Sequence, residues 1–253
     1  MKLLRDYKAF YERGYQVISG VLNEDEILYY KERLNQIYEK QIDECDICTL
    51  KDINEENMVR APFLYDSSFI KLFYSKFANN IVRSILGDYA ILSLQNAIIV
   101  SPHYKHHQNF FHRDIIHQDF FPSRPIAINL YYCLDDYDKN NGGTIFVPRS
   151  HKKEKKDVNF TDYKTPPAKA GSVILFDSMI YHKAGNNTAD KFRFGINHMY
   201  TLPFVKQQIN YPLCLKDETT DPLLNRILGF ESREFLNVKD FRNFRRDRMK
   251  KDE

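Results

Sequence analysis

The order of its apolar patterns predicts that this chain has an α+β fold with a β-barrel or β-sandwich core. Up to about residue 87 the apolar residues recur with helical spacing, and from about residue 88 to 205 they form short strand-like runs. Helices followed by an unbroken series of strands are typical of α+β domains, because α/β folds alternate the two. A chain of 253 residues can form one large domain or two small ones, and the unbroken series of strands favours one core. We therefore expect a single domain over 1–253, with a C-terminal helical extension from about 206 to 253.

The N-terminal part is predicted to hold a short helix, a strand at "GYQVISGVL" and two amphipathic helices. The first amphipathic helix should begin after Asn23, because Asn23 and Glu26 have the spacing of a capping box. The second should span 67–86 and end at Gly87. The face of the first helix that we expect to be buried carries Ile27, Tyr30, Leu34, Ile37 and Tyr38.

The predicted strands are rich in branched and aromatic residues and are bounded by Gly, Asn, Asp and Pro. They correspond to the runs "YAILSLQNAIIVSP", "IAINLYYCLDD", "GTIFVPRS", "GSVILFDSMIYH" and "RFGINHMYTLPF". The tail over 233–253 differs from them, since it carries eight Lys/Arg and five Asp/Glu with Phe and Leu at helical spacing. A solvent-exposed amphipathic helix accounts for this tail.

The composition argues against several kinds of partner. A net charge of +3 is too small to indicate binding to nucleic acid or to an anionic membrane. No run approaches the roughly 18 consecutive apolar residues of a membrane span, and the charged N-terminus does not resemble a signal peptide. Cys45 and Cys48 form a C-x-x-C without a second pair or a neighbouring His, so two ordinary thiols are favoured over a zinc or redox site. We expect a cytoplasmic protein with no nucleic-acid or membrane partner.

The stretch "NFFHRDIIHQDFF" offers two candidate pairs of metal ligands. It contains His-x-Asp twice, as His112 with Asp114 and as His117 with Asp119. On an extended chain a His and an Asp two positions apart point to the same face, which presents two ligands together. One such pair arises often by chance, so a metal site needs a third ligand.

A third ligand is offered by His182, which ends an apolar strand, and Arg193 opens the next strand. Two His and one carboxylate on one face of an octahedral metal suit non-haem Fe(II) and leave three positions open. A guanidinium near such a metal can bind a carboxylate in bidentate fashion. Separately, His182 is explained by a core histidine and Arg193 by a salt bridge at the rim. Their occurrence together on consecutive strands favours the metal site.

On these residues the sequence resembles the phytanoyl-CoA dioxygenase family of Fe(II)/2-oxoglutarate-dependent oxygenases. The resemblance covers most of the chain, through the blocks "GYQVISGVLNEDEI", "SRPIAINLYYCLDDYDKNNGGTIFVPRSHK" and "AGSVILFDSMIYHKAGNNTADKFRFGI". The "NNGG" with the following "VP" and "SHK", and the His and Arg separated by ten residues, are characteristic. Arg149 departs from the family, which usually has Gly before Ser-His-Lys.

The resemblance implies a double-stranded β-helix (jelly-roll) core with flanking N-terminal and C-terminal helices. It also implies Fe(II), with 2-oxoglutarate and O2 as cosubstrates. His182 would be the distal iron ligand, and Arg193 would bind the far carboxylate of 2-oxoglutarate. Further residues expected to line the cosubstrate pocket are Tyr131, Asn129 and Gln95.

The resemblance does not fully decide between the two His-x-Asp pairs. Many bacterial relatives have a layout like "HRDIIHQDFFPSRP", which favours His112 and Asp114 as ligands. Other members more often spell the motif "HQD", so His117 and Asp119 remain the alternative. The pair that does not bind metal should lie near the mouth of the site, where we expect His117, Gln118 and Asp119 to contact substrate.

The implied reaction is hydroxylation of an unactivated C–H bond in a small metabolite or carrier-bound intermediate, with decarboxylation of 2-oxoglutarate to succinate. A zinc-dependent hydrolase could use the same His and Asp residues with a metal-bound water. It would leave Arg193 without a role. A non-catalytic jelly-roll binding module is a third hypothesis, and intact ligands at all three positions argue against it.

Overall fold

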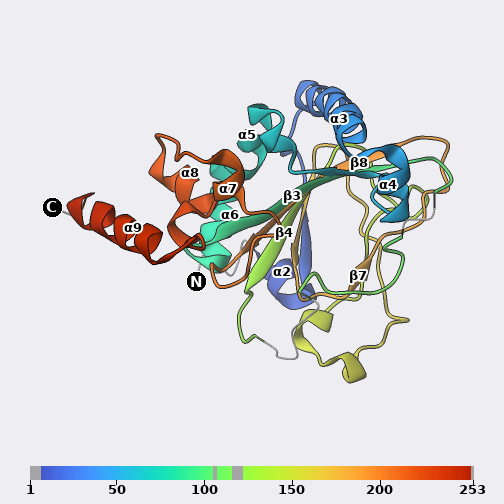
Figure 1. Ribbon diagram of the computed structural model, residues 1–253. Coiled ribbons are helices and arrows are strands. Elements are labelled where there is room, and N and C mark those ends of the chain that lie inside the picture. Colours follow the sequence, from blue (N-terminus) through green and yellow to red (C-terminus); the bar gives the residue numbers. More distant parts are fainter. Residues whose placement is uncertain (1–6, 105–106, 116–121, 252–253) are drawn as a thin grey trace.

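The computed structural model describes residues 7–104, 107–115 and 122–251 of the chain. A six-stranded antiparallel sheet forms its centre, with helices on one face and a two-stranded sheet on the other (Figure 1). In spatial order, the large sheet consists of β1 (Tyr15–Ile18), β6 (Val173–Asp177), β4 (Ala127–Cys133), β8 (Arg193–Thr201), β3 (Ile91–Val100) and β2 (Met58–Arg60). The two edge strands β1 and β2 therefore come from the N-terminal part of the chain.

The smaller sheet pairs β5 (Ile145–Phe146) with β7 (His182–Lys183). Isolated bridges extend it on both sides, from Phe146 to Lys164 and from His182 to His112. The two sheets pack face to face, since Phe146 stacks on Tyr15 at 4.9 Å and contacts Phe176 at 5.2 Å between ring centroids. Two facing antiparallel sheets are the architecture that the sequence predicted.

Alternation along the strands assigns each side chain of the large sheet to one of two faces. On β4, Leu130 and Tyr132 pack into the main core on the helix-covered face, whereas Tyr131 faces the smaller sheet. The same alternation on β8 directs Ile196 to the helices and leaves Asn197 in the cavity between the sheets. The site is therefore lined by every second residue of these strands.

Helices cover the other face and bury it. The longest, α3 (Glu24–Cys45), begins at the predicted capping box between Asn23 and Glu26 and buries Ile27, Tyr30, Leu34 and Ile37, while Tyr38 is partly buried. Further helices are α2 (Lys8–Arg13), α4 (Ile47–Asp52), α5 (Ile70–Phe73), α6 (Lys76–Leu86), α7 (Tyr211–Leu215), α8 (Pro222–Ile227) and α9 (Val238–Lys251). The charged α9 extends away from the body of the protein (Figure 1). No helix in the described part of the chain is long and apolar enough to cross a membrane.

The single helix predicted over 67–86 is interrupted. A 3-10 turn (Ser67–Phe69) and α5 are followed by a break at Tyr74. Helix α6 then begins at Lys76, after the N-cap Ser75, whose hydroxyl accepts a hydrogen bond from the Ala78 amide at 3.2 Å. The Ser75 hydroxyl satisfies a free amide of the new helix, which makes a second start possible inside one apolar pattern. Gly87 ends the segment as predicted.

Candidate metal centre and cosubstrate pocket

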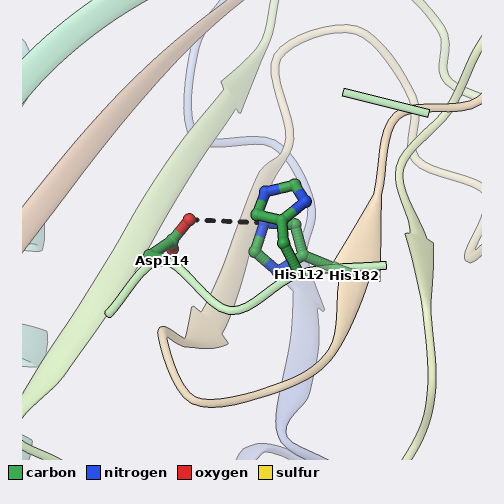
Figure 2. A group of neighbouring side chains, drawn as sticks. All are labelled: His112, Asp114 and His182. Carbon is green, nitrogen blue, oxygen red and sulfur yellow. Dashed lines mark ion pairs between the residues drawn. The ribbon is translucent and has the colours of Figure 1, made fainter. Parts of the chain in front are cut away.

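Three predicted ligands lie together between the two sheets. His112, Asp114 and His182 each offer one ligand atom, and these atoms lie within 4.8 Å of one another (Figure 2). They form the one group of this kind among the residues that the structure describes. The exposed thiols of Cys45 and Cys48 are free and belong to no such cluster in the described ranges.

Backbone pairing brings the ligands together from distant parts of the sequence. His112 and His182 exchange two backbone hydrogen bonds of 3.0 Å each, so they stand opposite each other at the edge of the smaller sheet. The Asp114 amide donates to the Ser178 carbonyl at 3.0 Å. His112 and Asp114 thus reach the same point from one extended segment, as their spacing predicts.

Each imidazole is oriented by a carbonyl of its own segment. The Nδ1 of His112 lies 3.0 Å from the Phe110 carbonyl, and the Nδ1 of His182 lies 3.0 Å from the Ile180 carbonyl. A carbonyl can only accept, so both Nδ1 atoms carry the proton. This arrangement leaves both Nε2 atoms as lone-pair donors and is typical of histidines that bind metals.

The carboxylate of Asp114 is held from two sides. Its Oδ1 lies 3.4 Å from the Nε2 of His182 (Figure 2). Its Oδ2 accepts a 2.6 Å hydrogen bond from the Asn129 amide. Asn129 also donates to the Ser178 hydroxyl at 2.8 Å and accepts from Asn197 at 2.8 Å. Asn129 therefore lies behind the carboxylate and fixes its orientation.

The electrostatics of the cluster match a cation site. Burial alone would raise the pKa of Asp114, but the two neighbouring histidines lower it below its ordinary value. Burial, with repulsion from His182, lowers the pKa of His112. Burial would also lower the pKa of His182, but the Asp114 carboxylate raises it. An ionised carboxylate beside two imidazoles is a donor set that suits a divalent iron.

Arg113, between the two ligands of the His-x-Asp pair, points away from the cluster and is 8 % exposed. Its Nε donates to the Met179 carbonyl at 2.8 Å, and its Nη2 donates to the carbonyls of Ser150 and Lys153 at 2.9 and 2.6 Å. The guanidinium also lies 4.3 Å from the centre of the Tyr181 ring. Arg113 thus ties the segment of His112 to the turn that leads into His182.

Arg193 lines the same cavity and is 3 % exposed. Its guanidinium lies 4.3 Å from the centre of the Tyr137 ring, and its Nε and Nη1 have no hydrogen-bond partner in the described part of the chain. A buried guanidinium with unused donors is costly unless a ligand supplies an acceptor. A carboxylate of 2-oxoglutarate fits this requirement.

The other predicted pocket residues separate into two groups. Tyr131 lines a cavity of about 350 Å³ together with the three ligands and Arg193. Gln95 lies on the helix-covered face of β3, where it accepts from the Phe63 amide at 2.8 Å and donates to the Phe69 carbonyl at 3.1 Å. Its position therefore gives no support to a contact with the cosubstrate. The predicted substrate residues His117, Gln118 and Asp119 lie outside the described residues.

Several cavity residues had no role in the sequence-based prediction, and three of them lie together. Arg60, Asn96 and Gln208 line the end of the cavity near β2. Strand β2 has only three residues and follows a helical region, so neither its length nor its pattern distinguishes it from a loop.

Comparison with known proteins identifies the family of this chain. The sequence pattern of the family described as "Phytanoyl-CoA dioxygenase (PhyH)" matches residues 10–195. The chain belongs to this family. The predicted class of enzyme, the dioxygenases, and the prediction of iron and 2-oxoglutarate as cofactors are thereby confirmed at the level of the family.

Curated relatives align over nearly the whole chain. "Uncharacterized protein Rv1501" of Mycobacterium tuberculosis is 30% identical over 237 residues, which cover 90% of this chain and 87% of the relative. "Dioxygenase af480" of Aspergillus fumigatus is 27% identical, with 86% of this chain and 74% of the relative covered. The human peroxisomal phytanoyl-CoA dioxygenase is 20% identical, with 96% and 81% covered.

Solved structures confirm the predicted jelly-roll fold. The iron-bound structure of EctD from S. alaskensis superposes with a TM-score of 0.64 at 21% identity, covering 79% of this chain and 76% of EctD. The non-haem α-ketoglutarate-dependent carbocyclase SnoK from nogalamycin biosynthesis gives a TM-score of 0.63 at 16% identity, with 86% and 92% covered. At these identities the likeness is one of fold.

Proposed function

We propose that this protein is an Fe(II)/2-oxoglutarate-dependent oxygenase that hydroxylates an unactivated C–H bond of a small metabolite or carrier-bound intermediate. The observation that carries the proposal is the shared cavity, in which the His112, Asp114 and His182 cluster lies beside a buried arginine with unused donors. Iron bound there, with 2-oxoglutarate and O2, supplies C–H oxidation coupled to decarboxylation of 2-oxoglutarate to succinate.

The residues of the chain divide the work of binding and orientation. The Nε2 atoms of His112 and His182 and the carboxylate of Asp114 would hold the metal, and the cosubstrate and oxygen would bind beside it in the same cavity. Arg193 would pair with the distal carboxylate of 2-oxoglutarate in a site screened from water, which strengthens the pairing. Tyr131 would pack beside this carboxylate.

The presence of a carboxylate ligand, Asp114, supports hydroxylation as the outcome. Related halogenases resemble this family but have a small residue in place of the Asp, which leaves room for chloride. In this chain Asp114 is present and is held by Asn129. A zinc hydrolase would leave the unpaired donors of Arg193 without a ligand, so the oxygenase accounts for more of the site.

The proposal is tested by anaerobic addition of Fe(II) and 2-oxoglutarate to the metal-free protein. A metal-to-ligand charge-transfer band in the visible spectrum is expected, and admission of O2 should yield succinate. His112→Ala should abolish the band, and His117→Ala is the matched control that should retain it. Absence of the band in the unmodified protein would refute the proposed function. Loss of the band only in His117→Ala would instead assign the metal to the second pair.

A further inference from the structure

A row of four polar side chains crosses the inner face of the large sheet. Tyr131 of β4, Asn197 of β8, Asn96 of β3 and Arg60 of β2 stand opposite one another in strand register, and all four line the cavity. Three strand spacings of about 4.8 Å separate the first from the last, so the row extends roughly 14 Å from the cosubstrate end.

Apolar side chains flank this row on both sides. Leu94 and Met199 are register partners on one side, and Ile98 and Met58 are register partners on the other. A molecule that lies along the row therefore meets hydrogen-bonding groups along one line and hydrocarbon on either side. Such a lining selects molecules with a polar group at a fixed distance from an aliphatic part.

Arg60, at the end of the row, is held in place by the protein itself. Its backbone amide donates to Gln41 at 2.9 Å and its carbonyl accepts from Gln41 at 2.7 Å. Its guanidinium forms a two-point ion pair with Glu55, and its Nη1 donates to the Gln208 side chain at 3.2 Å. Because Glu55 offsets the positive charge, Arg60 presents N–H donors with little net charge to the cavity.

Apart from Arg193 at the cosubstrate end, the cations Arg113 and Lys183 of the cavity wall are engaged by other groups. Arg113 donates to three carbonyls, and the ammonium of Lys183 lies 4.8 Å from the centre of the Phe111 ring. At the β2 end, the Asn96 amide is oriented with its oxygen accepting from the Arg60 Nη1 at 2.6 Å and its nitrogen donating to the Gln95 carbonyl at 2.8 Å. The Asn96 and Gln208 carboxamides thus stand beside Arg60 as uncharged polar groups. This end therefore suits an uncharged polar group better than a carboxylate or an ammonium.

We propose that the substrate is an uncharged polar small molecule whose hydroxyl, carbonyl or amide group binds at Arg60, Asn96 and Gln208. Its aliphatic part then lies along the row toward the metal centre. The proposal rests on the proposed function, since it takes the opposite end of the same cavity to hold the metal and 2-oxoglutarate.

The test uses the full chain loaded with Ni(II) and 2-oxoglutarate, which prevents turnover. Four probes with one carbon skeleton, hexanamide, 1-hexanol, hexanoate and hexylammonium, are compared at millimolar concentration by ligand-detected NMR. Hexanamide and 1-hexanol are expected to bind about fivefold or more tightly than the two charged probes, a difference equivalent to about one net hydrogen bond.

Two variants locate the binding. Gln208→Met alters an exposed side chain and should leave the fold intact. Arg60→Met removes the guanidinium at the end of the row. Each should weaken hexanamide binding about fivefold. Arg33→Met is the matched control, because Arg33 forms a comparable ion pair with Asp66, 2.5 Å between Nε and Oδ2, outside the cavity.

Three results would overturn the inference: tighter binding of hexanoate than of hexanamide, unchanged binding in both cavity variants, or no binding of any of the four probes. Binding of 2-oxoglutarate to the Ni(II) protein is measured first. If 2-oxoglutarate does not bind, the proposed function itself fails, and this failure is distinct from the three above.

Discussion

Replacing Arg113 by Met is expected to weaken metal binding in protein that is still folded. The methionine keeps an apolar stem against Tyr181 but removes the donors to the carbonyls of Met179, Ser150 and Lys153. These hydrogen bonds link the segment of His112 to the turn before His182 and to the segment of Ser150. Without them, the two halves of the ligand cluster are held by backbone pairing and by the contacts of Asp114 with His182 and Asn129.

The magnitude follows from the contacts that are lost. A buried acceptor left without its donor costs about 1–3 kcal/mol, and three carbonyls lose their donor here. Part of this cost is offset, because the variant no longer has to bury a charged guanidinium. We therefore expect the free energy of unfolding of the metal-free protein to fall by about 2–4 kcal/mol. Loss of groups that orient metal ligands typically weakens metal binding by about 10–100-fold, and the same range is expected here.

The assay is a Co(II) titration of the metal-free protein, followed by visible absorption at a temperature well below the unfolding transition of each variant. Arg113→Lys, which keeps the charge but loses the planar fork, should give an intermediate affinity. Arg33→Met is the control, since its partly buried ion pair with Asp66 lies outside the metal cavity. A Co(II) affinity of folded Arg113→Met within about threefold of the unmodified protein, well below the range expected for an orienting group, would refute the reasoning.

Three further predictions concern the cosubstrate, the core and acid–base behaviour. Arg193→Met should raise the Kd for 2-oxoglutarate by about 100-fold, because a charge-assisted bidentate pair is lost, while the Co(II) affinity is retained. Equilibrium dialysis with labelled 2-oxoglutarate measures this Kd, and an unchanged Kd would show that Arg193 does not bind the cosubstrate. Gly195→Ala should disorder the Arg193 pocket, because the added Cβ would lie 2.1 Å from the Tyr137 hydroxyl. A lower melting temperature and weaker 2-oxoglutarate binding are expected, and no change in either would contradict the close packing of Gly195 against Tyr137. Burial raises the pKa of Asp177 to about 7, so the folded chain keeps a proton that the unfolded chain releases near its ordinary pKa of 3.8. The stability from this group is full below about pH 4 and is lost as the pH rises through about 7. The free energy of unfolding of Asp177→Asn, measured in urea, should therefore exceed that of the unmodified protein by about 3–4 kcal/mol at pH 8 and by much less at pH 5. An equal difference at both pH values would exclude this titration.

Much of the fold follows from local pattern. The capping box at Asn23, the apolar face of α3 and the central strands could be predicted because helical spacing and strand-like runs mark them directly. The break before α6 could not, since the apolar spacing continues through Tyr74 and only the side-chain cap at Ser75 separates the helices. The pairing of β1 and β2 with distant strands is a long-range property that no local pattern carries.

The candidate site was predictable where residue type and spacing agree. His112 and Asp114 share a face because they are two apart, and His182 and Arg193 stand at ends of consecutive strands. Gln95 shows where such reasoning stops. Its strand lines the cavity, but its neighbours Leu94 and Asn96 face inward and Gln95 therefore faces the helices. The phase of an alternating strand is set by its register with its neighbours, and the apolar content of β3 is similar on both faces.

Register also connects the metal centre to the polar row proposed to bind substrate. The Asp114 carboxylate can only accept, so the Asn129 amide must turn its nitrogen toward it, and the Asn129 oxygen is left to accept from Asn197. Asn197 stands opposite Tyr131 and Asn96 in the row. The orientation of a row residue is thus determined by the ionised state of a proposed metal ligand. Since coupling between two binding sites is reciprocal, metal binding that fixes Asp114 should strengthen substrate binding at the row, and substrate should strengthen metal binding by the same factor.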